Sequence, residues 1–353
     1  MSETTTLDAA RARSARLEQQ IAENPGRFRV LTGERPTGPL HLGHYVGTLA
    51  NRVRLQQAGV ELMLILADYQ VITDRDDIGD LRATVREILL DYVAVGIDVE
   101  RATIFTHSAV PALNQLMLPF LSLVSVAELD RNPTVKAETA ATGGRAMSGL
   151  MLTYPVHQAA DILFCHGNLV PVGQDQLPHL EMTRVVARRF NQRYAPDAPY
   201  FPEPDALLAP TPTVLGTDGT KMSKSRGNAL MLSATEDETA RWVKRAKTDA
   251  ERHITYDPQG RPEVANLLDL LTLATGEDPA LAAERIGDGG AGTLKRELTE
   301  ALVEHLRPLR ERRAAAASAG DDVLEVLRRG NARANELADA TLADVRRLMG
   351  TDY

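Results

Sequence analysis

The sequence has little cysteine and no long apolar run, and each shortage excludes a class of protein. A single cysteine, Cys165, in 353 residues excludes an internal disulfide and a cysteine-based zinc site. The longest mostly apolar run, residues 116–129, is interrupted by Pro119 and two serines and is shorter than the roughly 20 residues of a membrane-spanning helix. We therefore expect a cytoplasmic protein that does not associate with membranes.

Basic residues are also fewer than acidic residues. Lys and Arg total 40 against 48 Asp and Glu, a net charge of -8, so the whole surface is not expected to attract nucleic acid. Any polyanion must meet local basic groups. The content of 43% hydrophobic and 25% charged residues is typical of a folded protein, and the length predicts about two domains.

Strand and helix patterns alternate over the first two-thirds of the chain. Such alternation predicts an α/β fold, a Rossmann-like doubly wound parallel sheet. The expected strands are residues 28–33, 60–67, 103–106 and 168–172, and the expected helices are residues 44–58, 78–95, 110–129, 149–164 and 177–193.

The remaining segments suggest the boundaries of three parts. Residues 4–23 predict an exposed helical extension, and the proline-rich residues 196–212 predict a loop. Beyond Glu236 no strand pattern is found, which predicts an all-helical C-terminal domain with a flexible break at the glycine-rich residues 287–292. The expected parts are residues 1–26, 27–228 and 229–353.

Two short segments carry the strongest chemical signal. The first, RPTGPLHLGH at residues 35–44, follows the first expected strand, and the second, KMSKS at residues 221–225, lies in a loop rich in Gly, Thr and Ser. A helix that begins near His44 offers free amides to a phosphate, and Gly43 lets a nucleotide approach the backbone. His41 and His44 can donate hydrogen bonds to phosphate oxygens, and a loop with two lysines can close over pyrophosphate.

Each segment also has a purely structural interpretation. The histidines could be helix-start residues without a ligand, and the lysines could lie on a solvated surface loop. A metal pair is disfavoured because no carboxylate or cysteine stands at matching spacing nearby, so no metal site is expected. It is the combination of both segments, in this order, that favours function.

Together HLGH and KMSKS resemble the paired signatures of the class I aminoacyl-tRNA synthetases. The resemblance implies activation of an amino acid with ATP and Mg²⁺ to an aminoacyl-adenylate, followed by transfer to tRNA. Residues 154–161 (YPVHQAAD) and 170–176 (VPVGQDQ) narrow it to the tryptophanyl and tyrosyl enzymes. Tyr154, Gln158 and Asp161 have the spacing of one helix face, and residues 173–175 follow a strand, at the sheet edge where ligands bind.

The choice between tryptophan and tyrosine depends on the first strand. Tyrosyl enzymes commonly place a Tyr at the position of Leu31, two residues before Gly33. Leucine cannot hydrogen-bond a phenol but can pack against an indole ring, which favours L-tryptophan and tRNA(Trp). A tyrosyl enzyme and a catalytically idle paralogue that acts as a binding module remain the alternatives, as does a small-molecule ligase of the same superfamily.

The resemblance implies three sets of site residues. The catalytic set is His41, His44, Lys136, Lys221 and Lys224. The ATP-binding set is Arg35, Pro36, Thr37, Gly43, His44, Gly173, Gln174, Asp175, Val214, Lys221, Met222, Ser223, Lys224 and Ser225. The tryptophan-binding set is Leu31, Gly33, Ala67, Gln70, Tyr154, Gln158, Asp161, Val172 and Gln176.

Further expectations concern subgroup and partners. Gln70 and Gln158 depart from the His and Met of common bacterial tryptophanyl enzymes, and the chain resembles a divergent, auxiliary subgroup. The altered pocket leads to the hypothesis of lowered affinity for tryptophan-mimicking antibiotics. The family resemblance also implies a homodimer, and arginines of the helical domain are candidates for contacts with tRNA phosphates, namely Arg307, Arg310, Arg312, Arg313, Arg328 and Arg329.

Overall fold

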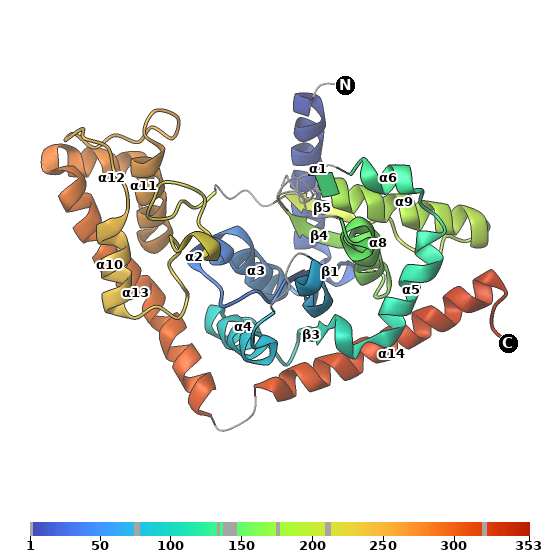
Figure 1. The fold of residues 1–353 in the computed structure, drawn as a ribbon. Helices are drawn as coiled ribbons and strands as arrows, with labels where there is room; N and C mark the ends of the chain where they lie inside the picture. The colour runs from blue at the N-terminus through green and yellow to red at the C-terminus, as the bar shows by residue number, and fades with distance from the viewer. Residues whose placement is uncertain are drawn as a thin grey trace.

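A parallel sheet lies at the centre of the molecule. The computed structural model describes residues 3–73, 78–132, 135–136, 147–173, 177–208, 213–319 and 323–353. Within these ranges five parallel strands pair in the order β3-β2-β1-β4-β5 (Figure 1). The strands are β1 (Arg29–Glu34), β2 (Glu61–Leu66), β3 (Thr103–Thr106), β4 (Leu169–Val172) and β5 (Asp205–Leu208). The strand order reverses at β1: β2 and β3 lie on one side of it, and β4 and β5 lie on the other side.

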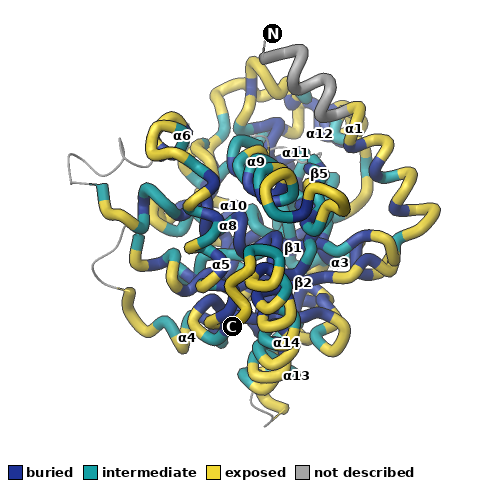
Figure 2. Tube along the Cα trace, turned by 90° about the vertical axis from the view of Figure 1, so that its right-hand side faces the viewer, coloured by how far each residue is buried: buried dark blue, intermediate teal, exposed yellow. Residues whose placement is uncertain are grey.

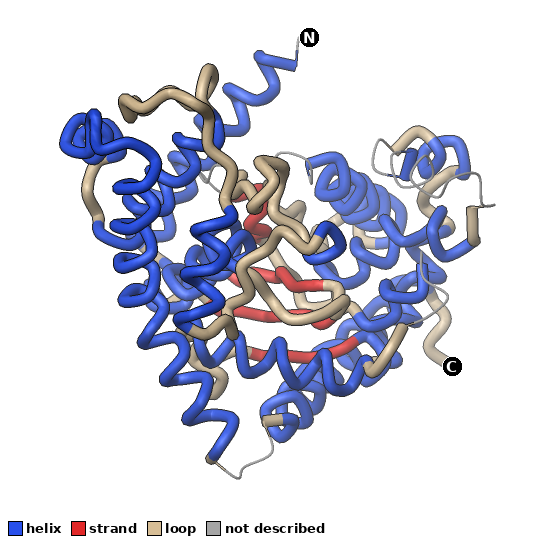
Figure 3. The backbone as a smooth tube through the Cα atoms, turned by 60° about the vertical axis from the view of Figure 1, so that its left-hand side comes forward, coloured by secondary structure: helices blue, strands red, loops and turns tan. Residues whose placement is uncertain are grey.

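Helices cover both faces of this sheet because alternate strand residues are apolar on both sides. Leu62 and Leu64 of β2 belong to one core, whereas Met63 and Ile65 belong to the other. The expected fold, a doubly wound sheet with a helical C-terminal region, is confirmed. Figure 3 shows the strands between two layers of helices, and Figure 2 shows that buried residues gather around the strands.

The first core is completed by α1 (Glu3–Glu23), α4 (Leu81–Val95), α10 (Glu236–Arg245), α11 (Pro262–Thr275), α12 (Pro279–Ile286) and α13 (Gly290–Ser318). The second contains α5 (Pro111–Leu121), α8 (Gly149–Leu163), α9 (Leu177–Tyr194) and α14 (Leu324–Met349). Between β1 and β2 the chain forms α2 (Leu42–His44), a π-helical turn at Tyr45–Leu49, and α3 (Ala50–Ala58). None of the helices in the described ranges is both long and apolar enough to cross a membrane.

The N-terminal helix and a fifth strand differ from expectation. The proline-rich stretch contains β5, an edge strand too short to show in the pattern, so the loop expectation is wrong there. One face of α1 covers β5: Ser14 Oγ accepts a hydrogen bond from the Leu208 N–H at 3.0 Å, and Leu17 is buried. The extension is therefore helical, and over residues 12–23 it is exposed on one side only and protects a sheet edge.

Two helix boundaries also differ. The helix expected over residues 110–129 is interrupted, because Ser125 starts a new helix, α6 (Val126–Asp130), in a capping box with Glu128. The glycine-rich break is one turn, Gly287–Gly289, and α13 begins directly at Gly290. The flexible break expected there is thus a single tight turn between two helices.

The last helix returns to the sheet after the helical layer of α10–α13, as Figure 1 shows. A side chain on Gly330 of α14 would place Cβ 1.8 Å from the Ile104 carbonyl oxygen, so only glycine permits this approach to β3. Asn331 Oδ1 accepts a hydrogen bond from the Thr106 N–H at 3.0 Å. The helix α14 thereby covers the β3 edge of the sheet.

Candidate active site

A cavity of about 330 Å³ opens at the carboxyl ends of β1 and β4, where the strand order reverses. Ligands of open α/β sheets bind at this place. Gly33 and Gly173 line the cavity from the two strands. A Cβ on Gly33 would lie 1.9 Å from the Ile65 carbonyl oxygen, so glycine is required for β1 to lie beside β2 here.

Most of the expected tryptophan-binding residues line this one cavity. They are Leu31, Gly33, Ala67, Gln70, Tyr154, Gln158, Asp161 and Val172, joined by Arg35 and Gly173 of the ATP-binding set. Gln174, Asp175 and Gln176 lie outside the described residues. The lining also includes residues that sequence reasoning missed, namely Thr32, Glu34, Thr48, Arg52, Ile65, Ile162 and His179, and it includes Val170 and Pro171 of the segment 170–176.

The helix α8 carries the polar face of the cavity. Ser148 caps its first turn, with Oγ accepting a hydrogen bond from the Met151 N–H at 3.1 Å. The i, i+4, i+7 spacing then directs Tyr154, Gln158 and Asp161 toward the cavity. The Tyr154 hydroxyl lies 3.4 Å from His179 Nε2, so α9 orients the phenol.

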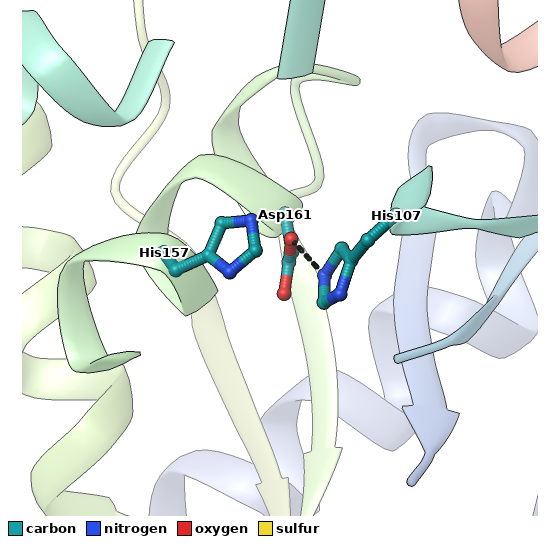
Figure 4. Close-up of side chains that lie close together, drawn as sticks. All are labelled: His107, His157 and Asp161. Carbon is teal, nitrogen blue, oxygen red and sulfur yellow. Dashed lines mark hydrogen bonds and ion pairs between the residues drawn. The ribbon is translucent and has the colours of Figure 1, made fainter. Parts of the chain in front are cut away.

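Asp161 is at the centre of a buried cluster with His107 and His157 (Figure 4). His107 Nε2 and Asp161 Oδ1 are 2.8 Å apart, and the two imidazole rings stack with centroids 4.2 Å apart. His157 Nε2 lies 2.8 Å from Asn114 Oδ1, whose amide nitrogen donates to the His107 carbonyl at 2.7 Å. Since the Nε2 atoms of both rings are already hydrogen-bonded, we interpret the cluster as a hydrogen-bonded support for Asp161, the member of the three that lines the cavity.

The histidine segment (residues 41–44) and the signature loop (residues 221–225) are in direct contact. The Gly43 N–H donates to the Met222 sulfur at 3.3 Å, and Lys224 Nζ donates to the Gly38 carbonyl at 3.0 Å. Just beyond the loop, the Leu42 N–H donates to the Leu230 carbonyl at 2.8 Å. The chain therefore brings together two segments that lie some 180 residues apart in the sequence.

Electrostatics at this junction favour a bound anion. Burial, His44 and Lys224 lower the pKa of His41 to about 3, and burial, Lys224, Arg52 and Lys221 lower the pKa of His44 to about 4. Both imidazoles are neutral at neutral pH. The His41 N–H donates to His44 Nδ1 at 3.1 Å, which leaves the proton of neutral His44 on Nε2, where it can be donated to a ligand.

Asn228 fixes the shape of the signature loop, and sequence reasoning missed it. Its Oδ1 accepts a hydrogen bond from the Ser223 N–H at 2.8 Å, and its amide nitrogen donates to Asp218 at 2.8 Å. The Trp242 indole N–H of α10 donates to the Asn228 carbonyl at 2.8 Å. A Cβ on Gly216 would lie 2.3 Å from Asn228 Cγ, so the loop packs tightly around this side chain.

A buried ion pair supports the cavity from the side of α3. Arg52 is 2% exposed and pairs with Glu34 at 2.5 Å, and it also donates to Thr32 Oγ1 at 3.0 Å. The Tyr92 hydroxyl donates to the other oxygen of Glu34. These contacts join the end of β1 to α3 and α4. An isolated arginine in a polar stretch gave no sequence signal for this role.

The other expected ATP-binding residues lie around the same junction, with one difference in role. Val214 is buried, and its carbonyl accepts a hydrogen bond from the Met222 N–H at 2.9 Å. Met222 is itself buried against Gly43, so it does not present an open surface for packing against a base. Pro36 is buried and Thr37 half-buried in the turn before the histidine segment, whereas Ser225 is exposed on the loop.

Lys136 is exposed and is not among the described residues that line the cavity.

The six arginines considered for RNA contacts are all engaged within the chain. Arg313 pairs with Asp91 at 2.9 Å and Arg310 with Glu236 at 3.3 Å. The remaining contacts are Arg307 with Glu304, Arg312 with the Ala94 carbonyl, Arg328 with Glu325 and Arg329 with Glu100.

Comparison with known proteins gives consistent matches over almost the whole chain. The family model of class I tRNA synthetases (W and Y) matches residues 23–307. A tryptophan–tRNA ligase of Streptococcus mutans is 40% identical over 337 residues, covering 92% of this chain and 98% of that relative. One of Treponema pallidum is 42% identical over 332 residues, covering 92% and 97%. The crystal structure of tryptophanyl-tRNA synthetase from Campylobacter jejuni, complexed with ADP and tryptophan, has a TM-score of 0.77 at 26% identity, covering 92% of this chain and all of that one.

Proposed function

The chain belongs to the class I tRNA synthetases of the W and Y family, and from that premise we propose how its site activates tryptophan. It is a tryptophan–tRNA ligase, as 40% identity to such ligases over 92% of the chain supports. The expectation of tryptophan rather than tyrosine is thereby confirmed. In the proposed reaction, the tryptophan carboxylate attacks the α-phosphorus of ATP, diphosphate leaves, and the tryptophanyl group then passes to tRNA(Trp) with release of AMP.

The cavity takes the amino acid. Leu31 packs against the indole ring, and Asp161 accepts a hydrogen bond from the indole N–H. The Tyr154 hydroxyl, oriented by His179, binds the ammonium group together with Gln176. The support for these roles is that Leu31, Tyr154 and Asp161 line one cavity whose apolar and polar walls match an amphipathic ring.

The junction of the histidine segment and the signature loop takes the triphosphate. His41 and His44 donate hydrogen bonds to phosphate oxygens, and Lys221 and Lys224 neutralise the charge that develops on the leaving diphosphate. Gly43 and residues 173–175 hold the adenosine, and Lys136 has to approach the phosphates from its exposed position. The nitrogen donors at this junction do not suit Mg²⁺, which prefers oxygen, so Mg²⁺ enters bound to ATP and has no protein site of its own.

The hydrogen bond from Lys224 to the Gly38 carbonyl is the single observation that carries this proposal, because it places a signature lysine beside the histidine segment. The test is exchange of labelled diphosphate into ATP, run with tryptophan, with tyrosine and without amino acid. Exchange that depends on tryptophan is the expected result. Exchange with tyrosine alone would favour the tyrosyl alternative, and no exchange in a folded protein would favour the idle paralogue.

A homodimer and a cytoplasmic location complete the proposal. Leu118 of α5 and Val126 of α6 are 70% and 69% exposed, and a second copy would bury such apolar side chains. In the dimer each tRNA crosses between subunits, and arginines of the helical layer contact its phosphates after leaving their acidic partners. Sedimentation at equilibrium tests the dimer, and a monomer at micromolar concentration would contradict it.

The finer assignment to an auxiliary, antibiotic-tolerant type rests on Gln70 and Gln158, both of which line the cavity. Amide side chains at these positions change the hydrogen-bonding groups that a tryptophan mimic meets. We expect weaker inhibition by such antibiotics than for an enzyme with His and Met at these positions. Equal inhibition constants for the two enzymes would remove this assignment.

A further inference from the structure

We propose that His107 is a positioning residue for tryptophan selection, which holds Asp161 so that one carboxylate oxygen faces the cavity as a fixed acceptor for the indole N–H. The inference rests on the proposed function and deepens it. His107 lies outside every segment that carries the family resemblance, and it does not line the cavity within the described part of the chain. It acts through Asp161.

The contact between the two residues is direct and fully buried. His107 follows β3 and is 0% exposed, and Asp161 of α8 is 2% exposed. Their atoms Nε2 and Oδ1 lie 2.8 Å apart, and Figure 4 shows the imidazole beside the carboxylate. Since Oδ1 is occupied by His107, Oδ2 is the oxygen left for a ligand in the cavity that Asp161 lines. A carboxylate with one fixed oxygen cannot turn freely about its terminal torsion.

The surroundings of His107 favour a charged imidazole. Burial opposes charge on the imidazole, but the Asp161 carboxylate, its hydrogen bond and the nearby Asp68 outweigh burial, so the pKa of His107 is raised. Asp68 is itself held by the backbone N–H of Ser108 at 3.1 Å. On the other side, burial lowers the pKa of His157, so the stacked ring stays neutral.

A second neighbour limits the motion of His107 without adding charge. The Tyr69 ring stacks at 6.3 Å between centroids on the imidazole, which already packs against the His157 ring. The imidazole is therefore held between two rings, with the Asp161 carboxylate at hydrogen-bond distance.

The test compares tryptophan with an analogue in which sulfur replaces the indole N–H. The wild-type chain uses the analogue less well in diphosphate exchange, because Asp161 loses its donor. His107→Leu removes both charge and donor, and we expect the kcat/KM ratio of tryptophan to analogue to fall about tenfold, the effect of one lost charge-assisted hydrogen bond. The KM for ATP is expected to stay within about twofold, since the proposed function assigns Asp161 to the indole ring and not to ATP.

His107→Gln separates charge from hydrogen bonding, because glutamine keeps a donor but carries no charge. A neutral hydrogen bond is weaker than a charge-assisted one, so the tryptophan-to-analogue ratio of kcat/KM in this variant is expected to fall about threefold, to a value between those of the wild-type chain and His107→Leu. His166→Asn is the matched control: it removes a histidine beside Tyr200, away from the cavity, and asparagine tolerates the positive φ of 53° there. Its tryptophan-to-analogue ratio is expected to equal that of the wild-type chain.

The outcomes distinguish this inference from the proposed function. If the wild-type chain shows no tryptophan-dependent exchange, the proposed function fails. If the wild-type chain is active and His107→Leu keeps the full ratio, the positioning role is wrong. Should His107→Leu not fold by circular dichroism, the tryptophan-to-analogue ratio of His107→Gln decides: a ratio equal to that of the wild-type chain overturns the proposal, and a ratio lowered about threefold supports it.

Discussion

Replacement of Asn228 by alanine should slow adenylate formation without weakening tryptophan binding. Asn228 is 3% exposed and holds the signature loop through its side chain, whereas its main-chain carbonyl receives the Trp242 indole. The substitution removes the side-chain contacts only. The loop then samples conformations in which Lys221 and Lys224 no longer face the histidine segment. Reaching the transition state then requires free energy to bring both lysines back to that segment.

The magnitude follows from the contacts that are lost. The Ser223 N–H loses its 2.8 Å acceptor and Asp218 loses a 2.8 Å donor. Each hydrogen bond contributes about 1 kcal/mol net, and an amide left unsatisfied costs about 1–3 kcal/mol more. If about 2 kcal/mol of this loss is added to the activation free energy of adenylate formation, the reaction slows about 30-fold.

Rapid quenching of a single turnover measures the rate, and the KM for tryptophan is expected to stay unchanged. Trp242 is the single tryptophan of the chain, so its fluorescence, recorded without the substrate, reports on the loop directly. Asn191→Ala is the matched control, because Asn191 makes comparable contacts to residues 200 and 201 away from the loop. It should lower the melting temperature but not the rate. A wild-type rate for Asn228→Ala would refute the reasoning.

Three more outcomes are expected. Lys224→Ala should slow adenylate formation at least about tenfold and more than Lys221→Ala, because Lys224 has the larger effect on the pKa of His44; equal single-turnover rates for the two variants would contradict this order. In Lys224→Ala the pKa of His44, followed by NMR titration, should rise above about 4 because a nearby positive charge is gone, yet stay below the ordinary 6.5 because burial, the largest cause, remains. An unchanged value would show that the lysine lies elsewhere in solution. Leu17→Ala on α1 should lower stability to urea by about 2–4 kcal/mol, whereas Gln20→Ala, on the exposed face, should have little effect; equal small effects would show that α1 does not dock.

The sheet could be predicted from the sequence because its strands are buried on both faces. Short, mostly apolar runs such as residues 60–67 are typical of strands in a buried parallel sheet. The structure places strands at all four expected positions. The fifth strand could not be found, since Asp205–Leu208 is short, lies at the edge and follows a run of prolines. It pairs with β4 and is covered by α1, a contact between segments about 190 residues apart.

The site shows the same division between local and distant information. Leu31, Tyr154 and Asp161 could be placed because each belongs to a motif with a fixed spacing. His107 and His179 could not, because their partners Asp161 and Tyr154 lie 54 and 25 residues away in the sequence. Arg52 and Asn228 could not either, because their nearer partners belong to other elements or to the turns of a loop, with no fixed spacing. Met222 is among the expected ATP-binding residues, yet the fold buries it against Gly43. The spacing of residues in a sequence indicates which side chains lie close together on one helix or strand. It does not indicate which helices and strands contact each other.

A double-mutant cycle between His44 and Lys224 tests the central claim most directly, that two distant segments act on one triphosphate. Single-turnover rates of adenylate formation are measured for the wild-type chain, His44→Ala, Lys224→Ala and the double variant. Because both groups stabilise the same developing charge, the double variant should be at least about fivefold faster than the product of the two single effects predicts, a coupling of about 1 kcal/mol. Rate effects that simply multiply would show that the two segments act independently, and would contradict the account.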